Sequence, residues 1–416
     1  MKKSILAASV GTVALAGLAW AASGGMGNGN GGGTVLLPAS SSASTAAAPT
    51  VQASPAATSD GTQLAADGKH IVDAYICVFR AGGVGRGSER AEANRSANAA
   101  GGSVGHVYEH AIQGFSVHAS ARGVEMMARN NPRIDYCEQD QVMTVIDPVF
   151  ADARPGGVTV TAGGTQQTPP GITRVNGGVS GATGTAWVID TGIDLTHPDL
   201  NVDTVRSKNF VTRESSPNDL NGHGSHVSGT IAAKDNTEGV IGVAAGAKLV
   251  AVRVLDRRGS GSNSDVIAGV DYVGANGALG DVANMSLGGG VSTALDTAVI
   301  NASSKVKFAL AAGNDGGDAN LHSPARVNGP NIYTIAAFNA PNGAWASFSN
   351  YGKPPVDYAE PGVNVLSTWK AGGYNTISGT SMATPHMAGL LLLGGIRDGG
   401  SVTRTGASDS YIIGVH

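Results

Sequence analysis

Ser381 lies in the segment Gly-Thr-Ser-Met-Ala-Thr-Pro-His at 379–386, between a Gly-punctuated, strand-like stretch and the apolar run Met387 to Leu393. This order predicts a helix that begins at or next to Ser381, where free backbone N–H groups and the positive end of the helix dipole favour developing negative charge. Such a serine suits acyl transfer, because Gly379 leaves room for a substrate backbone and the N–H of Ser381 can donate to a tetrahedral oxyanion. A lone Gly-Thr-Ser is usually an ordinary helix N-cap, and the other stretches of the sequence decide between the two interpretations.

Two further polar residues stand next to predicted elements. Asp190 follows the apolar run 185–189 directly, and a buried acid needs a partner, for which a histidine is the obvious candidate. The alternative for Asp190 is a cap of the turn Thr191-Gly192. His223 lies in Asn-Gly-His-Gly-Ser-His, where glycines on both sides let other groups approach its ring. The three side-chain types together are those of a nucleophilic serine activated by a base.

His226 lies three residues after His223, so a metal-binding pair is the alternative for these two histidines. No Glu stands between them as in His-Glu-x-x-His, and no further ligand cluster appears. The pattern therefore favours His226 as a packed or hydrogen-bonded neighbour.

The elements that must position these residues alternate short apolar runs with helical patterns from Pro170 onward. This alternation predicts an α/β fold, a parallel sheet flanked by helices, with reactive residues at strand carboxyl ends and helix N-termini. The candidate strands are Thr185–Ile189, Lys248–Arg253, Val282–Met285 and Lys307–Ala311, and the candidate helices are His223–Ala232, Asp265–Ala275, Thr293–Ser304 and Ser381–Leu393.

A smaller unit precedes this domain, and its pattern βαββαβ predicts a ferredoxin-like α+β domain. Its candidate strands are Ala74–Arg80, Val104–Tyr108, Phe115–Ser120 and Ile134–Gln139, and its candidate helices are Glu89–Ala100, with Ser88 as N-cap, and Ala121–Asn130. Both cysteines of the protein, Cys77 and Cys137, fall on its first and last strands, which are neighbours in the usual strand order. A disulfide and two separate core cysteines remain open alternatives.

The chain of 416 residues begins with Met1-Lys2-Lys3 and an apolar run that ends in Ala19-Trp20-Ala21. This is typical of a secretory signal, with an uncleaved membrane anchor as the alternative. We therefore divide the chain into a signal peptide 1–22, a low-complexity flexible spacer 23–67, the small domain 68–147, a linker 148–168 and the large domain 169–416. A net charge of -4 gives no electrostatic reason to expect a nucleic-acid partner.

Asp190 in Asp-Thr-Gly, His223 in His-Gly-Ser-His and Ser381 in its octet, in that chain order, resemble the subtilisin-like serine proteases (subtilases), specifically the proteinase K-like branch. The match covers about Thr168 to Leu392. The small domain resembles the inhibitory I9-type propeptide of the same enzymes, in Gly-His-Val-Tyr-Glu-His-Ala and Glu-Gln-Asp-Gln. The resemblance implies a secreted serine endopeptidase, made as a zymogen that cuts itself between 147 and 168.

The resemblance also implies the roles of the site residues. His223 would act as the general base and acid, Asp190 would orient it, and Asn314 would be the second oxyanion donor. The substrate-binding residues would be the edge segment Gly259, Ser260 and Gly261 and the pocket walls Ser286, Leu287, Gly288, Ala311, Ala312 and Gly313. We expect broad specificity, with a large apolar or aromatic residue before the cut.

No cofactor is required for this chemistry. Pro330, Ile332 and Asp357 match positions of a structural calcium site in the proteinase K-like branch, two through backbone carbonyls and one through a carboxylate. The expected partners are protein or peptide substrates and the protein's own propeptide. We expect a monomer without nucleic acid and without stable membrane association.

Two other classes remain as alternatives. A catalytically silent surface or binding protein of subtilase fold is disfavoured because the triad and Asn314 occur together. An esterase or lipase is disfavoured because no Gly-x-Ser-x-Gly elbow surrounds Ser381. The chain departs from the family at Leu220, where this branch often has Cys, and at Gly394-Gly395, which interrupts the last helix before a polar, Gly-rich tail. The packing of the C-terminal face is therefore left open.

Overall fold

The computed structural model of the protein describes residues 69–146 and 165–416. The expected signal peptide, the spacer and nearly all of the linker lie outside the described residues. In the two described segments, no helix is long and apolar enough to cross a membrane.

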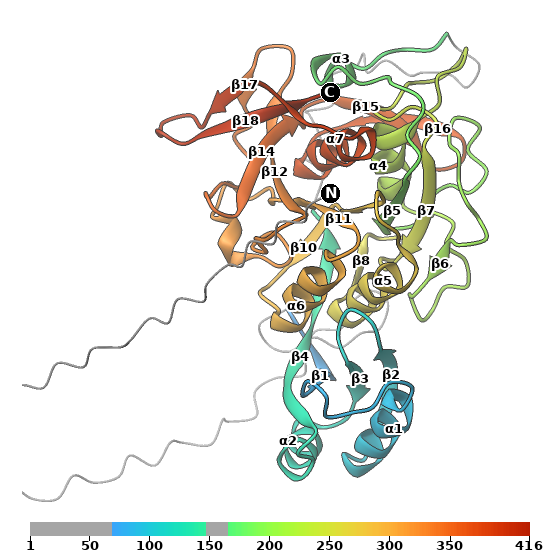
Figure 1. Cartoon of the computed structure of the whole chain (residues 1–416), viewed down its shortest axis with the longest axis vertical. Helices are drawn as coiled ribbons and strands as arrows, with labels where there is room; N and C mark the ends of the chain where they lie inside the picture. Colours follow the sequence, from blue (N-terminus) through green and yellow to red (C-terminus); the bar gives the residue numbers. More distant parts are fainter. Residues whose placement is uncertain (1–68, 147–164) are drawn as a thin grey trace, which may run out of the picture. The chain divides into compact units, whose positions relative to one another are not determined.

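The larger unit is built on a ten-stranded sheet with the order β17-β18-β14-β12-β11-β9-β5-β7-β6, and β13 is attached to β12 (Figure 1). The four predicted strands form its parallel centre, with β5 one residue longer than predicted. Their apolar runs are buried throughout, as expected for central parallel strands. The strands of this sheet are β5 (Thr185–Asp190), β6 (Lys208–Asn209), β7 (Lys248–Arg253), β9 (Val282–Met285), β11 (Lys307–Ala311), β12 (Ile332–Asn339), β13 (Ala344–Trp345), β14 (Val356–Pro361), β17 (Arg397–Thr403) and β18 (Ser410–Val415).

Two pairs of helices cover opposite faces of this sheet. In β5, Trp187 and Ile189 belong to the core beneath α5 (Asn263–Asn276) and α6 (Thr293–Ala302). The alternate residues Ala186 and Val188 belong to the core beneath α4 (His223–Ala232) and α7 (Thr380–Leu393). The remaining short elements of this unit are α3 (Pro170–Arg174), η1 (Ala319–Leu321) and a separate hairpin of β15 (Val365–Trp369) and β16 (Gly373–Ile377).

The C-terminal tail forms a hairpin that the sequence did not lead us to expect. Helix α7 ends at Leu393, as predicted, and Gly394 follows it with a φ of +75°. β17 and β18 then pair antiparallel, and β18 adds parallel to β14, so the sheet is mixed rather than purely parallel. The ring of Tyr411 is buried 5.1 Å from that of Trp345, measured between centroids. The Gly-rich composition concealed the alternating apolar residues that seal this edge.

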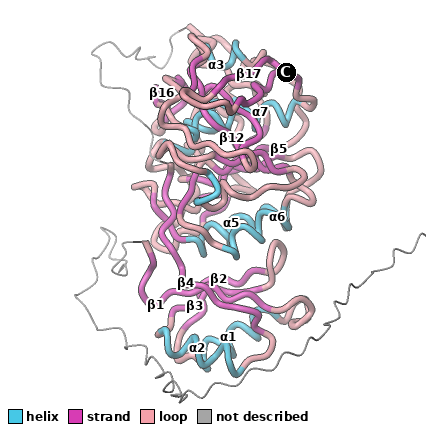
Figure 2. Tube along the Cα trace, turned by 90° about the vertical axis from the view of Figure 1, so that its left-hand side faces the viewer, coloured by secondary structure: helices cyan, strands magenta, loops and turns pink. Residues whose placement is uncertain are grey.

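The small unit has the predicted order of elements, with sheet order β4-β1-β3-β2. Helices α1 and α2 cover one face of this sheet (Figure 2). Cys77 and Cys137 are directly opposite each other in β1 and β4 and form a disulfide, so the first of the two alternatives holds in this structure. The elements are β1 (His70–Phe79), α1 (Glu89–Ala99), β2 (Ser103–Tyr108), β3 (Gly114–His118), α2 (Ala121–Asn130) and β4 (Ile134–Val145).

Strand β4 continues beyond its predicted end at Gln139. Residues 142–145 leave the small sheet and pair antiparallel with two short strands of the larger unit, β8 (Ser260–Ser262) and β10 (Leu287–Gly289). The prediction ended the strand too early because Asp140 and Gln141 are polar, yet both are buried.

Candidate active site

Strand β5 and helix α4 bring Asp190 and His223 together. Asp190 is the last residue of β5, and α4 begins at His223 after Gly222, whose φ of +115° favours glycine. His223 Nδ1 lies 2.8 Å from Oδ1 and 3.0 Å from Oδ2 of Asp190, and the N–H of Thr191 donates to Oδ1 at 2.7 Å. Because a carboxylate only accepts, His223 carries its proton on Nδ1, which leaves Nε2 as the basic nitrogen.

Ser381 lies in the first turn of α7 and is fully buried. Its Oγ lies 3.1 Å from the carbonyl oxygen of Ser286 and 3.3 Å from that of Ile146. His223 Nε2 is buried without a hydrogen-bond partner among the described residues, so Ser381 and His223 are not hydrogen-bonded to each other here. The structure therefore confirms the Asp190–His223 contact and turns the Ser381 hydroxyl toward Ile146.

The carbonyl of Ser381 is held by Ser286, for a reason that lies in the sequence. Pro385 stands four residues later in α7 and has no N–H to donate back to Ser381. The hydroxyl of Ser286 donates to this carbonyl instead, at 2.9 Å, and the side-chain amide of Asn284 donates to Ser286 Oγ at 2.9 Å. Ser286, predicted as a pocket wall, thus also fixes the backbone of Ser381.

Asn314 follows β11 and faces the start of α7. Its Oδ1 accepts the N–H of Thr380 at 2.8 Å and the hydroxyl of Thr380 at 2.9 Å. These two hydrogen bonds fix the orientation of the amide, with Nδ2 on the side of Gly379. A Cβ added at position 379 would lie only 2.9 Å from that nitrogen. Glycine at 379 therefore leaves room for a donor next to Ser381. Ala311 and Ala312 are fully buried behind Asn314, and the N–H of Gly313 donates to the Thr380 hydroxyl.

The predicted substrate-binding edges do hold an extended strand, which is the protein's own segment 142–146. Ser260 and Gly261 lie opposite Thr144 and Met143, and the N–H of Val145 donates to the carbonyl of Gly259 at 2.8 Å. On the other side, Leu287 and Gly288 lie opposite Val145 and Thr144. The predicted strand ended at Gln139, although the alternating apolar residues Met143 and Val145 could have extended it.

Three carboxylates bind the small unit to α5 and α6. Asp271 of α5 accepts the N–H groups of Glu109, His110 and Ala111 at 3.1, 2.8 and 2.7 Å. Glu138 of β4 accepts from the first turn of α6, including the N–H of Thr293 at 3.1 Å. The Glu138 carboxylate satisfies free N–H groups at the N-terminus of α6 and complements the dipole of that helix.

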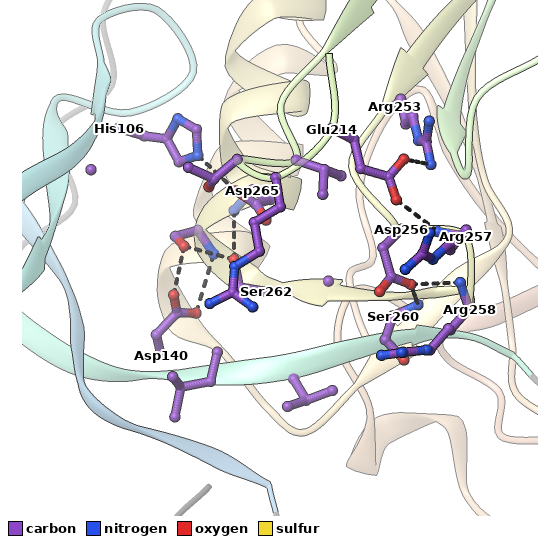
Figure 3. A pocket seen from close by; sticks show the side chains of 18 of the residues that line it. His106, Asp140, Glu214, Arg253, Asp256, Arg257, Arg258, Ser260, Ser262 and Asp265 are labelled. Atoms are coloured by element: carbon purple, nitrogen blue, oxygen red, sulfur yellow. Dashed lines mark hydrogen bonds and ion pairs between the residues drawn. The ribbon is translucent and has the colours of Figure 1, made fainter. Parts of the chain in front are cut away.

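Asp140 is the third of these carboxylates and the most deeply buried. It accepts the N–H and hydroxyl of Ser264 at 3.2 and 2.5 Å. Burial, with the nearby charge of Asp265 added, raises the pKa of Asp140 to about 7. Asp265 in turn lies 2.7 Å from Nε2 of His106. These residues line a cavity of about 1040 Å³ between the two units, together with Arg257 and Arg258 (Figure 3).

His226 is fully buried in α4 and contacts the backbone of β15. Burial lowers the pKa of His226 to about 3, and its Nε2 lies 3.0 Å from the carbonyl oxygen of Val365, so it is a neutral, hydrogen-bonded neighbour. Of the predicted calcium ligands, Ile332 is the first residue of β12, Pro330 stands two residues earlier, and Asp357 is the second residue of β14, which pairs with β12. Asp357 Oδ2 accepts the N–H of Thr334 at 2.9 Å, and burial raises the pKa of Asp357 to about 6.

Comparison with known proteins gives the family. The profile of the Subtilase family matches residues 187–394, which include Asp190, His223 and Ser381. The chain is 43% identical over 290 residues to alkaline serine exoprotease A of Vibrio alginolyticus, an alignment that spans 69% of this chain and 52% of that protein. It is 42% identical to the extracellular serine proteinase of Thermus sp. strain Rt41A over 73% of this chain and 71% of that protein.

A third relative covers more of both sequences. Proteinase R of Parengyodontium album is 36% identical over 336 residues, which is 79% of this chain and 80% of that protein. The profile match, these relatives and the α/β fold agree with the resemblance read from the three motifs, and the chain belongs to the subtilase family of serine proteases.

Proposed function

We propose that this chain is a secreted serine endopeptidase, made as an inhibited precursor that cuts itself between Ile146 and Asp147. The observation that supports it most is the position of residues 142–146. They lie extended between β8 and β10, and the carbonyl oxygen of Ile146 is 3.3 Å from Ser381 Oγ. A strand held by backbone hydrogen bonds on both sides binds with little regard to sequence, which suits a broad protease.

The proposed reaction uses the triad in its usual sense. Ser381 Oγ attacks the carbonyl carbon of Ile146 while His223 Nε2 takes its proton, and Asp190 stabilises the imidazolium that forms. The oxyanion accepts from the N–H of Ser381 and from Asn314 Nδ2. His223 then gives its proton to the amine of Asp147 as the peptide bond breaks, and water hydrolyses the acyl ester. Replacement of Asn314 by alanine is expected to cost on the order of 3 kcal/mol, the size known for loss of one such donor from subtilisin.

The bound segment also suggests the specificity. The Ile146 side chain lies next to Gly288: a Cβ added at position 288 would be 3.5 Å from Ile146 Cδ1. Met143, three residues earlier, is fully buried beside Gly289. We therefore propose an apolar preference at the residue before the cut and at the fourth residue before it. The expected preference for large or aromatic side chains remains part of this proposal.

The contacts of Glu138, Asp140 and Asp271 support a propeptide that stays bound as an inhibitor after the cut. Secretion is supported by the basic, then apolar, start of the sequence and by a relative named as extracellular.

We also propose a structural calcium ion. Pro330 and Ile332 would supply backbone carbonyls, and Asp357 is a partly buried carboxylate whose ionised form a cation would stabilise. The ion would add rigidity and take no part in the chemistry.

The test is to fold the precursor from Asp67 onward as wild type, as Ser381→Ala and as Ser378→Ala, and to determine intact masses and new N-termini. Ser378 is a buried serine three residues away that accepts the N–H of Asn364, so it controls for loss of a hydroxyl. We expect a new N-terminus at Asp147 in the wild type and in Ser378→Ala, and none in Ser381→Ala. If Ser381→Ala is cut alike, self-processing is refuted. If all three stay whole and a peptide substrate is not cleaved either, the silent-protein alternative holds.

A further inference from the structure

Asp219 is a buried carboxylate that the proposed reaction does not use. It lies four residues before His223, and only 2% of its surface is exposed. It accepts five hydrogen bonds. Oδ1 accepts from Thr191 Oγ1 at 3.0 Å and from the N–H groups of Asn221 and Gly222 at 2.8 Å each, and Oδ2 accepts from the N–H and the hydroxyl of Ser225 at 2.9 and 2.7 Å.

These five donors come from both sides of the triad. Thr191 follows Asp190, and its own N–H donates to the Asp190 carboxylate. Its hydroxyl donates to Asp219 and accepts the N–H of Gly224, the residue after His223. Asp219 therefore connects the end of β5, which carries Asp190, to the first turn of α4, which carries His223.

Asp219 also caps the helix that carries the histidine. The N-cap residue of α4 is Gly222, which has no side chain to accept a hydrogen bond. The Asp219 carboxylate accepts the N–H of Ser225 in its place. Burial raises the pKa of Asp219, and the five donors around the carboxylate oppose this effect because they stabilise the ionised form. Its negative charge lies at the positive end of α4, where His223 must become cationic in the transition state.

We propose that Asp219 is a positioning residue for the triad, which fixes Asp190 and His223 relative to each other and supports the charge that His223 acquires. The inference rests on the triad of the proposed function. It differs from a plain structural role, because it predicts a loss of kcat beyond any loss of stability.

Asp281, the residue before β9, offers a matched control because its carboxylate binds the other end of β5. It is 6% exposed and accepts the N–H of Thr185 at 2.8 Å, the indole N–H of Trp187 at 2.9 Å and the N–H of Ala278 at 3.1 Å. It thus anchors the start of β5, whereas Asp219 anchors the segment next to its end. Asp281→Asn should lower the Tm and leave kcat per active site within about twofold, because only distant geometry changes.

The experiment compares the full-length precursors of wild type, Asp219→Asn, Asp281→Asn and Ser381→Ala. A chromogenic peptide amide with an apolar residue before the cut gives kcat and KM, and a fluorophosphonate titrates the competent active sites. For Asp219→Asn we expect kcat to fall on the order of 10²-fold, the usual effect of misplacing catalytic groups by about 1 Å. We expect KM to stay within about threefold of the wild-type value, because β8 and β10 are untouched. We also expect the acid limb of the pH profile of kcat to lie at lower pH than in the wild type. If a variant does not mature, its rate of Ile146–Asp147 cleavage, followed by intact mass, replaces kcat.

The outcomes separate this inference from the proposed function. If Asp219→Asn behaves like Asp281→Asn, or changes KM and not kcat, Asp219 has no positioning role. If Asp219→Asn does not fold, Thr191→Val decides. It removes one donor to Asp219 and the acceptor of the Gly224 N–H, whereas Asp219 still accepts the N–H of Ser225 at the start of α4. It should lower kcat about threefold to tenfold with little change in Tm, and an unchanged kcat overturns the proposal. If Ser381→Ala stays active, the triad itself fails, whatever Asp219 does.

Discussion

Asp140→Asn should make the propeptide leave more slowly in neutral and alkaline solution. In the structure this carboxyl is 2% exposed, and burial raises its pKa from 3.8 to about 7. Once the propeptide is released, Asp140 is no longer buried against α5, and its pKa returns to the ordinary value. The bound state therefore favours the protonated acid. The asparagine amide keeps an acceptor for the N–H of Ser264 and cannot ionise.

The sign and size of the effect follow from these two values. Because the pKa is higher in the bound state, the contribution of Asp140 to binding is fully present below pH 3.8 and is lost as the pH rises to about 7. The two values differ by about three, which corresponds to ~4 kcal/mol, or about 10³-fold in the dissociation constant. This is an upper estimate, since water entering the interface would lower it.

The assay follows the appearance of activity after the processed complex is diluted into a chromogenic peptide between pH 5 and 9. We expect the lag of the wild type to shorten steeply up to about pH 7 and then level off. The lag of Asp140→Asn should be longer at pH 8 and depend less on pH. Asp135→Asn is the control, since Asp135 lies on the same strand with its side chain 53% exposed. If Asp140→Asn shows the same pH dependence as the wild type, the burial argument is wrong.

Three further predictions concern stability. Glu360 is fully buried, burial raises its pKa well above the ordinary value, and the N–H of Gly414 donates to its Oε1 at 2.9 Å. Because the pKa is higher in the folded state, the contribution of Glu360 to stability is lost as the pH rises. Glu360→Gln should therefore raise Tm by about 5 °C at pH 9 and hardly at pH 5, and equal shifts at both pH values would contradict this. Cys77 and Cys137 are 60 residues apart, so replacing both by alanine should destabilise the small unit by about 4 kcal/mol in denaturant unfolding, whereas two free thiols in the denatured, non-reduced precursor would show that no bridge exists. A chelator should lower the Tm of the mature wild type and leave Asp357→Asn unchanged, and a wild-type Tm insensitive to chelator rejects the calcium site.

The sequence was sufficient for the parts of the fold that repeat a simple pattern. Three of the four central strands have the predicted bounds, because a short apolar run between turns is typical of a buried parallel strand. The helix of His223 was likewise predicted from its flanking glycine to its last residue. Asp190 and His223 were predicted as a pair on chemical grounds, and the structure places them 2.8 Å apart.

The parts that the sequence did not reveal depend on contacts between distant segments. Asp140 and Gln141 ended the predicted strand because a polar side chain is normally exposed, whereas here the N-terminus of α5 supplies the partners for Asp140. The hairpin of β17 and β18 was hidden because its burial depends on Trp345 and Glu360, which stand more than 35 residues earlier. The sequence analysis did not single out Asp219, because only the folded chain brings Thr191 and Ser225 to it.

One geometric rule connects the candidate active site with strand β4. In a parallel sheet with crossover helices, the helix N-termini lie at the edge where the strands end. His223 and Ser381 start α4 and α7 at this edge, and Glu138 and Asp140 bind the first turns of α6 and α5. A single strand can therefore hold two helix N-termini with alternate side chains and present its next residues to Ser381. Because the two groups of contacts lie on different residues of β4, a change at Asp140 alters how long the propeptide stays and leaves the cleft that binds substrates intact.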